Sequence, residues 1–277
     1  MERILLAIDA VNPDKGALEF ACYLGKLTKS KITGVFLENM VARDQPVSVT
    51  SHEKTDPDFQ GQPVGHVTKI DLIEKNILLF KERCVKEEAM HNVHRDRGMP
   101  AGEVIAESRF ADVLVVDSET SFKKHYEGSP TEFVKTVLKK AECPVIIAPE
   151  SFEEVDEIVF AYNNTPSSVF ALKLFTYLFP QFHDKKITIL QANETGYWQD
   201  PDRYHFTEWL KEHYIHSGFE AVKGDADTVL LDCLLKRKNI FLVMGAYGRN
   251  TVSTLFKPSS ADLLIRTITA PIFIAHL

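Results

Sequence analysis

The sequence predicts two tandem α/β domains, each with a doubly wound, mostly parallel sheet. Apolar runs of strand length alternate along the chain with amphipathic segments of helical spacing, which is typical of strand–helix–strand units. The order of these segments repeats once, and a length of 277 residues suits two domains of ordinary size. Several runs are apolar without alternation, as expected of strands that are buried on both faces of a parallel sheet.

Composition and charge narrow the class of protein. The chain is 44% hydrophobic, which is typical of a soluble globular protein with apolar residues for two cores. Its formal net charge of −7 argues against nonspecific binding to nucleic acids or anionic membranes. No apolar run reaches membrane-spanning length, and Met1-Glu2-Arg3 leads into a short strand rather than a signal peptide. The four scattered cysteines contain no CxxC pair, so we expect buried thiols in a cytoplasmic protein.

The elements of the first half follow in strand–helix order. Strands are expected at 3–9, 31–37, 90–94, 111–117 and 144–149, and helices at 17–27, 70–85, 102–109 and 132–141. A polar stretch at 42–69, rich in Pro, Asp, Ser and Gly, precedes the second helix. We expect it to form a long loop or a partly disordered insertion.

The second half repeats this order. Residues 158–163 match the first strand, 239–244 match the strand at 112–117, and 270–275 match 143–148. Residues 209–216 are expected to form the counterpart of the helix that begins at Ile70. We infer an internal duplication, with domains at 1–149 and 154–277 joined by a short acidic segment at 150–156.

The stretch with the clearest chemical character follows the strand at 240–244. Gly245 and Gly248 form a turn, and Pro258-Ser259-Ser260 then open the amphipathic segment 261–268. Glycines let a backbone approach an anion closely, and the free N–H groups of a helix start carry partial positive charge. Ligands of parallel sheets bind beyond the carboxyl ends of the strands. The pattern therefore indicates a phosphate cradle at that edge.

These motifs resemble the universal stress protein family, and the resemblance covers nearly the whole chain. In that family an acid ends the first strand, and a G-x2-G-x9-G-[ST] stretch after the fourth strand binds ATP in the nucleotide-binding branch. The second half contains Gly245, Gly248, Pro258 and Ser259 at these intervals, followed by a closing Ala-Pro-Ile-Phe-Ile-Ala strand. The resemblance implies two Rossmann-like domains of the adenine nucleotide alpha hydrolase type.

The second half departs from the family pattern at two positions. Pro258 replaces the third glycine, so one N–H donor to a phosphate is lost, although proline is tolerated in the first turn of a helix. Asn163 replaces the acid at the end of the first strand and keeps a hydrogen-bonding carbonyl without the charge. We expect a weakened nucleotide site rather than none.

The first half has lost the motif. An alignment without gaps places Ser118 and Ser121 at the glycine positions and Thr131-Glu132 at the Gly-Ser position, while Asp9 keeps the acid. A carboxylate facing the phosphates would repel them, so we expect no triphosphate in this half. An alternative alignment through Gly128-Ser129 breaks the even spacing to Pro144.

The resemblance implies a ligand and a role. An adenine nucleotide such as ATP or ADP would be lined by residues of the second half: Ala161, Asn163, Ala192, Gly245, Gly248, Ser259 and Ser260. We expect a stress-response protein that senses or signals, with neither a catalytic residue nor a metal. A structural or adaptor protein without nucleotide is the alternative. Slow ATP hydrolysis is a further one, although no evident base or metal-binding carboxylate lies near the turn.

The expected partner of each domain is the other domain. An unpaired apolar edge strand invites aggregation, so the terminal strands at 144–148 and 271–275 should pair into an internal pseudo-dimer. A homodimer of tandem chains and an unidentified protein partner remain open.

Other clusters have plainer interpretations. Cys84, His91 and His94 could suggest a metal, but the two histidines share a face only on a helix, and a strand is expected there. Asp225 and Asp227 could form an acid/base pair, yet a capping role before a helix at 228–235 is favoured.

Three further segments are assigned structural roles. Ser167-Ser168 open a helix after Pro166, and Lys236-Arg237-Lys238 complement the dipole at a helix end. The aromatic segments Tyr197-Trp198 and Tyr204-His205-Phe206 are expected to pack over the edge of the second core, with stacking on an adenine as the alternative.

Overall fold

The computed structural model describes residues 1–39, 68–198, 203–246 and 258–276. The expected insertion at 42–69 falls almost wholly outside these residues, as does Gly248 of the glycine turn. The first half contains β1 (Arg3–Asp9), α1 (Lys15–Thr28), β2 (Lys31–Asn39), α2 (Lys69–Lys86), β3 (His91–Gly98), α3 (Pro100–Ser108), β4 (Val113–Val116), α4 (Glu132–Lys140) and β5 (Val145–Ile147).

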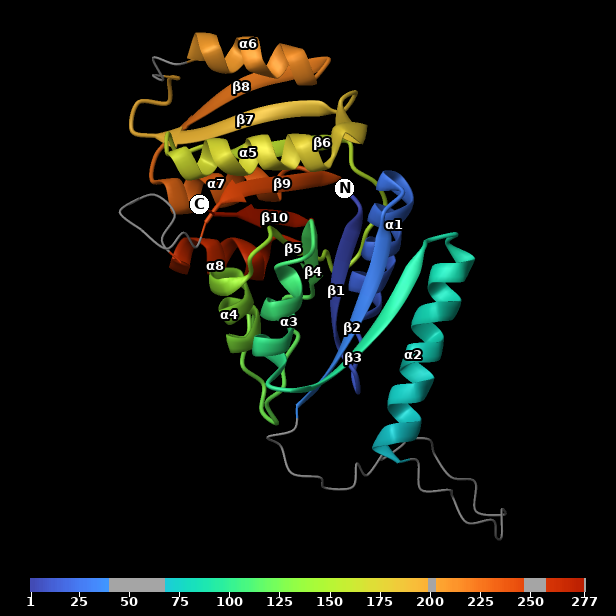
Figure 1. Ribbon diagram of the computed structural model, residues 1–277. Helices are drawn as coiled ribbons and strands as arrows, with labels where there is room; N and C mark the ends of the chain where they lie inside the picture. Colours follow the sequence, from blue (N-terminus) through green and yellow to red (C-terminus); the bar gives the residue numbers. More distant parts are fainter. Residues whose placement is uncertain (40–67, 199–202, 247–257, 277) are drawn as a thin grey trace, which may run out of the picture.

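The second half contains the same succession of elements. They are β6 (Glu157–Ala161), α5 (Pro166–Leu178), a 3-10 turn (Pro180–Phe182), β7 (Lys186–Asn193), α6 (Arg203–His213), β8 (His216–Lys223), α7 (Ala226–Leu235), β9 (Ile240–Gly245), α8 (Pro258–Thr267) and β10 (Ile272–Ala275). The strands form one ten-stranded sheet in the order β3-β2-β1-β4-β5-β10-β9-β6-β7-β8 (Figure 1). Each half has the same internal order, so the predicted duplication of topology is confirmed.

Side-chain caps fix where the helices begin. The Thr68 hydroxyl and the Asp71 carboxylate form a reciprocal capping box at α2, and Thr165 with Ser168 does the same at α5. Asp225 caps α7 through the N–H of Thr228 at 3.4 Å, as favoured from the sequence. These caps satisfy N–H groups that the helix itself leaves unpaired.

The two halves meet in the middle of the sheet. β5 and β10 pair antiparallel, with Ile147 opposite Ile272, Ile146 opposite Phe273 and Val145 opposite Ile274. The other strand pairs within the described residues are parallel. The predicted pairing of the terminal strands is therefore confirmed, and it removes the two edges that the halves would otherwise expose.

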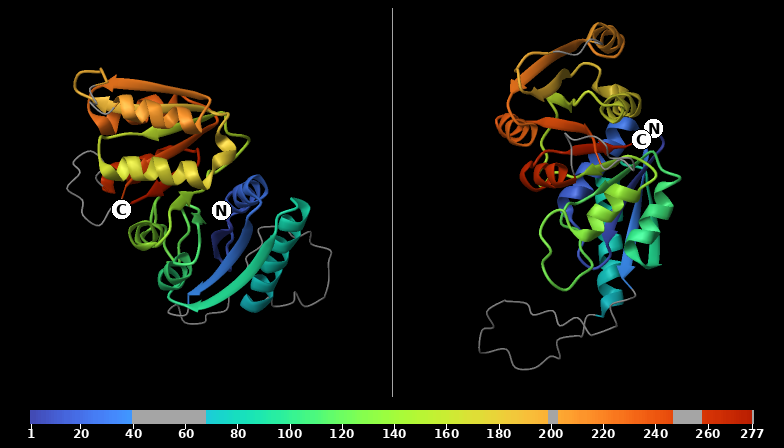
Figure 2. Two further views of the ribbon diagram at one scale, coloured as in Figure 1. Left: turned by 45° about the horizontal axis from the view of Figure 1, so that its top comes forward. Right: turned by 90° about the vertical axis from the view of Figure 1, so that its left-hand side faces the viewer.

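Helices cover both faces of this sheet (Figure 2). One buried apolar cluster contains residues of α1, α2, α5 and α6, and the other contains residues of α3, α4, α7 and α8. Both clusters run through both halves, because the joined sheet separates them along its whole width. The fold is thus a doubly wound α/β structure with two shared cores.

Aromatic rings tie the halves together on the face of α1 and α5. Phe20 of α1 contacts Phe241 of β9 with ring centroids 5.9 Å apart, and Phe152 of the connecting segment lies 5.0 Å from Phe20. Phe152 also packs on Tyr23 at 4.5 Å. The joint between the halves is therefore anchored in the core rather than free.

One helix differs from its prediction. The helix expected at 209–216 is α6 at Arg203–His213, and His216 instead begins β8, where it pairs with Lys186. Leu210 is the one fully buried α6 residue, so the apolar stripe that should mark the helix in the sequence is weak. Among the described residues, no helix has both the length and the apolar character needed to cross a membrane.

Candidate functional site

The carboxyl ends of β7, β6 and β9 bring together four of the predicted ligand-binding residues. Ala161 lies opposite Leu190 of β7 and Met244 of β9, so Asn163, Ala192 and Gly245 follow at the same edge of the sheet. α8 begins at Pro258, which places Ser259 and Ser260 in its first turn. Gly248 and the side chains of the two serines lie outside what the structure describes.

Asn163 is buried and already has a structural partner. Its Oδ1 accepts a hydrogen bond from the Thr165 hydroxyl at 2.5 Å, and Thr165 in turn accepts one from the N–H of Ser168 at 3.3 Å. Asn163 therefore closes the turn between β6 and α5. A carbonyl used in this way has less capacity left for a ligand hydroxyl.

Gly245 has a packing role that the sequence pattern did not reveal. A Cβ atom added there would lie 2.5 Å from the carbonyl oxygen of Ser167 and 2.8 Å from the backbone nitrogen of Ser168. The first turn of α5 thus crosses directly over the end of β9. Glycine is required at this position by the neighbouring backbone, whatever the ligand.

Ala161 and Ala192 supply an apolar wall. Both are buried in the core beneath α7 and α8, together with Met244 and Ala246. Their methyl groups offer no hydrogen bond. Of the four described residues brought together here, Asn163 is the one with a polar side chain.

The aromatic segment packs on the opposite face of the sheet. The Tyr162 ring stacks on Trp198 and on Phe206, each with centroids 5.4 Å apart, and Trp198 meets Phe219 edge-on at 4.9 Å. Tyr162 belongs to the core on the α5 side of the sheet, whereas Ala161 belongs to the core on the side of α7 and α8. The favoured packing interpretation is confirmed for Trp198 and Phe206.

The corresponding edge of the first half holds a cavity of about 660 Å³. Asp9, Asp14, Asp117 and Glu119 line it, together with apolar side chains of α1 and α2. A second cavity of about 610 Å³ shares Asp14, Asp117 and Glu119. None of these four carboxylates forms a salt bridge within the described residues, and they outnumber the cations of the two cavities, Lys15 and Arg266, so the edge is acidic.

Asp117 shows the electrostatic character of this edge. Burial, together with the negative charge of Asp14, raises the pKa of its carboxyl to about 6, against the hydrogen bond that it accepts from the N–H of Glu119 at 3.0 Å. An environment that disfavours one carboxylate disfavours a triphosphate more strongly. The absence of a nucleotide from this half stays a prediction, to which this negative charge adds a physical reason.

The residues that replace the glycine motif close their own loop. The Ser121 hydroxyl donates to Glu127 at 2.5 Å, and the buried Thr131 hydroxyl donates to the carbonyl of Thr120 at 2.5 Å. Thr131 also caps α4, which begins at Glu132. The start of α4 thus lies within one residue of the position that the alignment without gaps gives for the start of α8, and Gly128-Ser129 lie before the helix.

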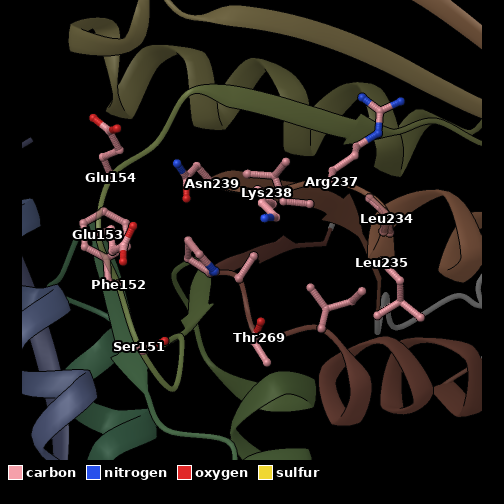
Figure 3. Close-up of a pocket in the computed structure, with 14 residues that line it drawn as sticks. Ser151, Phe152, Glu153, Glu154, Leu234, Leu235, Arg237, Lys238, Asn239 and Thr269 are labelled. Carbon is pink, nitrogen blue, oxygen red and sulfur yellow. The ribbon is translucent and has the colours of Figure 1, made fainter.

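A third cavity, of about 410 Å³, lies at the opposite edge of the sheet. Figure 3 shows Glu153 and Glu154 of the connecting segment on one side and Leu234 and Leu235 on the other. Arg237 near it forms salt bridges with Glu157 at 2.6 Å and with Glu220. The three basic residues 236–238 directly follow α7, which ends at Leu235 with Lys236 as its C-cap. The interpretation that they complement the dipole stays a prediction, and the Arg237 guanidinium is also held by two carboxylates.

The histidines near Cys84 have partners of their own. His94 Nδ1 lies 3.0 Å from a Glu107 carboxylate oxygen, and the His91 ring meets Phe80 edge-on. Both histidines lie on β3, as the strand prediction required. Within the described ranges, no group of three or more His, Cys, Asp or Glu side chains is arranged to hold a metal ion.

Several solved structures are similar to this chain over nearly its full length. A universal stress protein from Archaeoglobus fulgidus DSM 4304 matches with a TM-score of 0.68 and 17% identity, covering 99% of this chain and 98% of its own. The chain has the universal stress protein fold. A putative universal stress protein from Pseudomonas aeruginosa UCBPP-PA14 matches at 0.60 and 14% identity, over 100% of this chain and 93% of its own.

A functionally unknown protein from Pseudomonas aeruginosa PAO1 also matches, at a TM-score of 0.59 and 13% identity, over 99% of this chain and 92% of its own. No protein-family model and no curated protein matches the sequence. The three structures span nearly the full chain, which supports the tandem α/β arrangement; at these identities the likeness concerns the fold.

The contact between Gly245 and α5 predicts that any side chain at this position destabilises the protein. Gly245→Ala should lower the free energy of unfolding by about 1–3 kcal/mol, because its Cβ meets backbone that cannot rotate away. Gly218→Ala in β8 is the matched control, since a Cβ there meets nothing within 4 Å. Urea denaturation of both variants measures the difference; equal stabilities would show that α5 does not press on β9.

The environment of Asp117 predicts a pH-dependent effect. Its folded pKa of about 6 lies above the ordinary 3.8, so the stability it contributes is present at low pH and lost as the pH rises through 6. Asp117→Asn should therefore raise the free energy of unfolding by about 1–3 kcal/mol at pH 8 and leave it unchanged near pH 4.

Chemical denaturation at the two pH values tests this, with Glu119→Gln as the control, because Glu119 is an exposed carboxylate of the same loop. A gain for Asp117→Asn that is independent of pH would contradict the assignment.

Proposed function

We propose that the second half binds an adenine nucleotide at the carboxyl ends of β7, β6 and β9. The observation that carries this proposal is the joint placement of Asn163, Ala192 and Gly245 at one edge, with α8 as the next described helix in the chain. A helix N-terminus is suited to phosphate binding. The universal stress protein fold adds support, because a branch of that family binds ATP at this place.

The proposed contacts divide between the two ends of the nucleotide. The backbone around Gly245 and Gly248 and the Ser259 and Ser260 positions receive the phosphates, whereas Ala161, Asn163 and Ala192 flank the nucleoside. Pro258 removes one N–H donor. A charge-assisted hydrogen bond contributes about 1.5–3 kcal/mol, so its loss weakens binding by roughly tenfold or more.

The two halves then have different tasks. The domain at 1–149 carries the acidic edge and completes the sheet, and the domain at 154–277 holds the ligand. Binding acts as a signal: an occupied site favours one conformation of the protein, and with it one surface for a protein partner. We propose sensing rather than catalysis, since the sequence offers no base beside the glycine turn.

A structural or adaptor protein without a nucleotide is the second candidate. Two observations favour it: the Asn163 carbonyl is engaged by Thr165, and Gly245 is needed by α5. Both features are explained without a ligand. Nucleotide titration separates the two candidates.

Thermal denaturation with ATP, ADP and AMP at millimolar concentration is the direct test. A ligand of the folded state raises the melting temperature by mass action, so at least one nucleotide should produce a concentration-dependent rise. Mass spectrometry of the denatured, freshly purified protein shows whether a nucleotide copurifies. No rise and no copurified nucleotide would favour the adaptor. Phosphate release above a buffer control would instead indicate an ATPase.

Two variants sharpen the assignment to the second half. Pro258→Gly restores an N–H donor and should tighten nucleotide binding by about tenfold. Asp9→Asn changes the corresponding strand end of the first half and should leave the affinity unchanged. If Asp9→Asn abolished nucleotide binding and Pro258→Gly left it unchanged, the ligand would lie in the first half, which would contradict this proposal.

A further inference from the structure

Two thiols of the first half lie in contact. The Sγ atoms of Cys22 on α1 and Cys84 on α2 are 3.9 Å apart, although 62 residues separate them in the chain. Cys22 is 1% exposed and Cys84 is fully buried. Both are free in the structure, so they form a reduced dithiol between two helices.

The distance is compatible with oxidation of the pair. A disulfide joins its sulfur atoms at about 2.0 Å, so the thiols must approach by roughly 1.9 Å from the observed 3.9 Å. Each Sγ moves with a single χ1 rotation, and the two helices already pack on one another. No other pair of the four cysteines has a sulfur–sulfur contact within the described residues.

The two thiols are chemically unequal. Either thiol can donate in the contact between the two Sγ atoms. With Cys84 as the donor, this contact, aided by the charge of Arg83, lowers the pKa of the Cys22 thiol and raises the pKa of Cys84. The thiolate is the nucleophile in thiol chemistry, which makes Cys22 the attacking member. Cys143, by contrast, is buried alone, and burial raises its pKa to about 12.

We propose that Cys22 and Cys84 form a redox site that closes to an intramolecular disulfide when the protein meets a peroxide. The Cys22 thiolate attacks one peroxide oxygen, the O–O bond breaks, and one water leaves after protonation. The resulting sulfenic acid is attacked by Cys84, the S–O bond breaks, and a second water leaves. Two thiols are oxidised by two electrons, and one peroxide is reduced to two waters.

Formation of the disulfide would restrict the movement of two walls of the cavity in the first half. α1 supplies Lys15 and Leu18 to that cavity of about 660 Å³, and α2 supplies Asn76, Leu79 and Phe80. A covalent bond between the helices fixes these two walls relative to each other. The redox state of the dithiol would therefore set how far the acidic edge can open.

Burial makes the reaction depend on local opening of α2. This helix lies over the outer strands of the sheet (Figure 1). Several of its apolar side chains are exposed, including Leu78 and Val85. Oxidation should therefore be slower than that of an exposed thiol and should pair the two cysteines selectively. Selectivity distinguishes this site from general thiol damage.

Thiol counting on the folded, full-length protein tests the proposal. After hydrogen peroxide treatment and alkylation under denaturing conditions, alkylatable thiols should fall from four to two. Peptide mapping should recover a Cys22–Cys84 linked peptide that disappears on reduction. Oxidised protein should also melt at a higher temperature than reduced protein, because the cross-link restricts the unfolded chain.

Variants control for the other cysteines. The linked peptide should still form in Cys143→Ser and Cys233→Ser, and it should be absent in Cys22→Ser and Cys84→Ala. If a variant with a core substitution does not fold, peptide mapping of the unaltered protein decides the question. Four thiols remaining alkylatable in the folded protein, or a linked peptide that forms only in urea or joins other cysteines, would overturn the proposal.

Discussion

The antiparallel pairing of β5 with β10 is the interaction on which the rest of the structure depends. Each half alone would end in a short, fully apolar strand with an unpaired edge, which is an invitation to aggregation. Pairing these edges joins the halves into one sheet and extends both apolar cores across it. The contact of Phe20 with Phe241 exists because the sheet is continuous there. The tandem chain thus contains within itself the interface that a dimer of single domains would form.

The two halves share one topology but carry different residues at the carboxyl ends of their strands, so they can have different functions. At the carboxyl ends of its strands the second half offers small side chains, a neutral amide at Asn163 and a helix N-terminus. The same edge of the first half offers Asp9, Asp14 and Asp117 around a cavity. Backbone hydrogen bonds and apolar packing fix the sheet; Gly245 is needed for this packing, whereas the carboxylates of Asp9 and Asp117 belong to neither. Those residues were therefore free to diverge while the fold stayed the same.

Much of the fold could be predicted from the sequence, because buried parallel strands leave continuous apolar runs. The strands β1, β4, β6 and β9 fall at or near their expected positions. β8 was missed and α6 misplaced, since an edge strand with exposed residues such as His216 carries little apolar signal. At the candidate site, sequence spacing identified Gly245 but could not show that Ser167 approaches it. Contacts between residues distant in sequence, including Cys22 with Cys84, likewise required the tertiary structure.

Amide hydrogen exchange at the centre of the sheet tests the account most directly. If the β5–β10 pair joins the halves into one cooperative unit, the amides of Val145–Ile147 and Ile272–Ala275 should exchange only by global unfolding, with the same free energy as those of β1 and β6. The edge strands β3 and β8 should exchange sooner by local opening. Rapid exchange at β5 and β10 while β1 and β6 stay protected would show that the halves separate, and the account of one shared sheet would be contradicted.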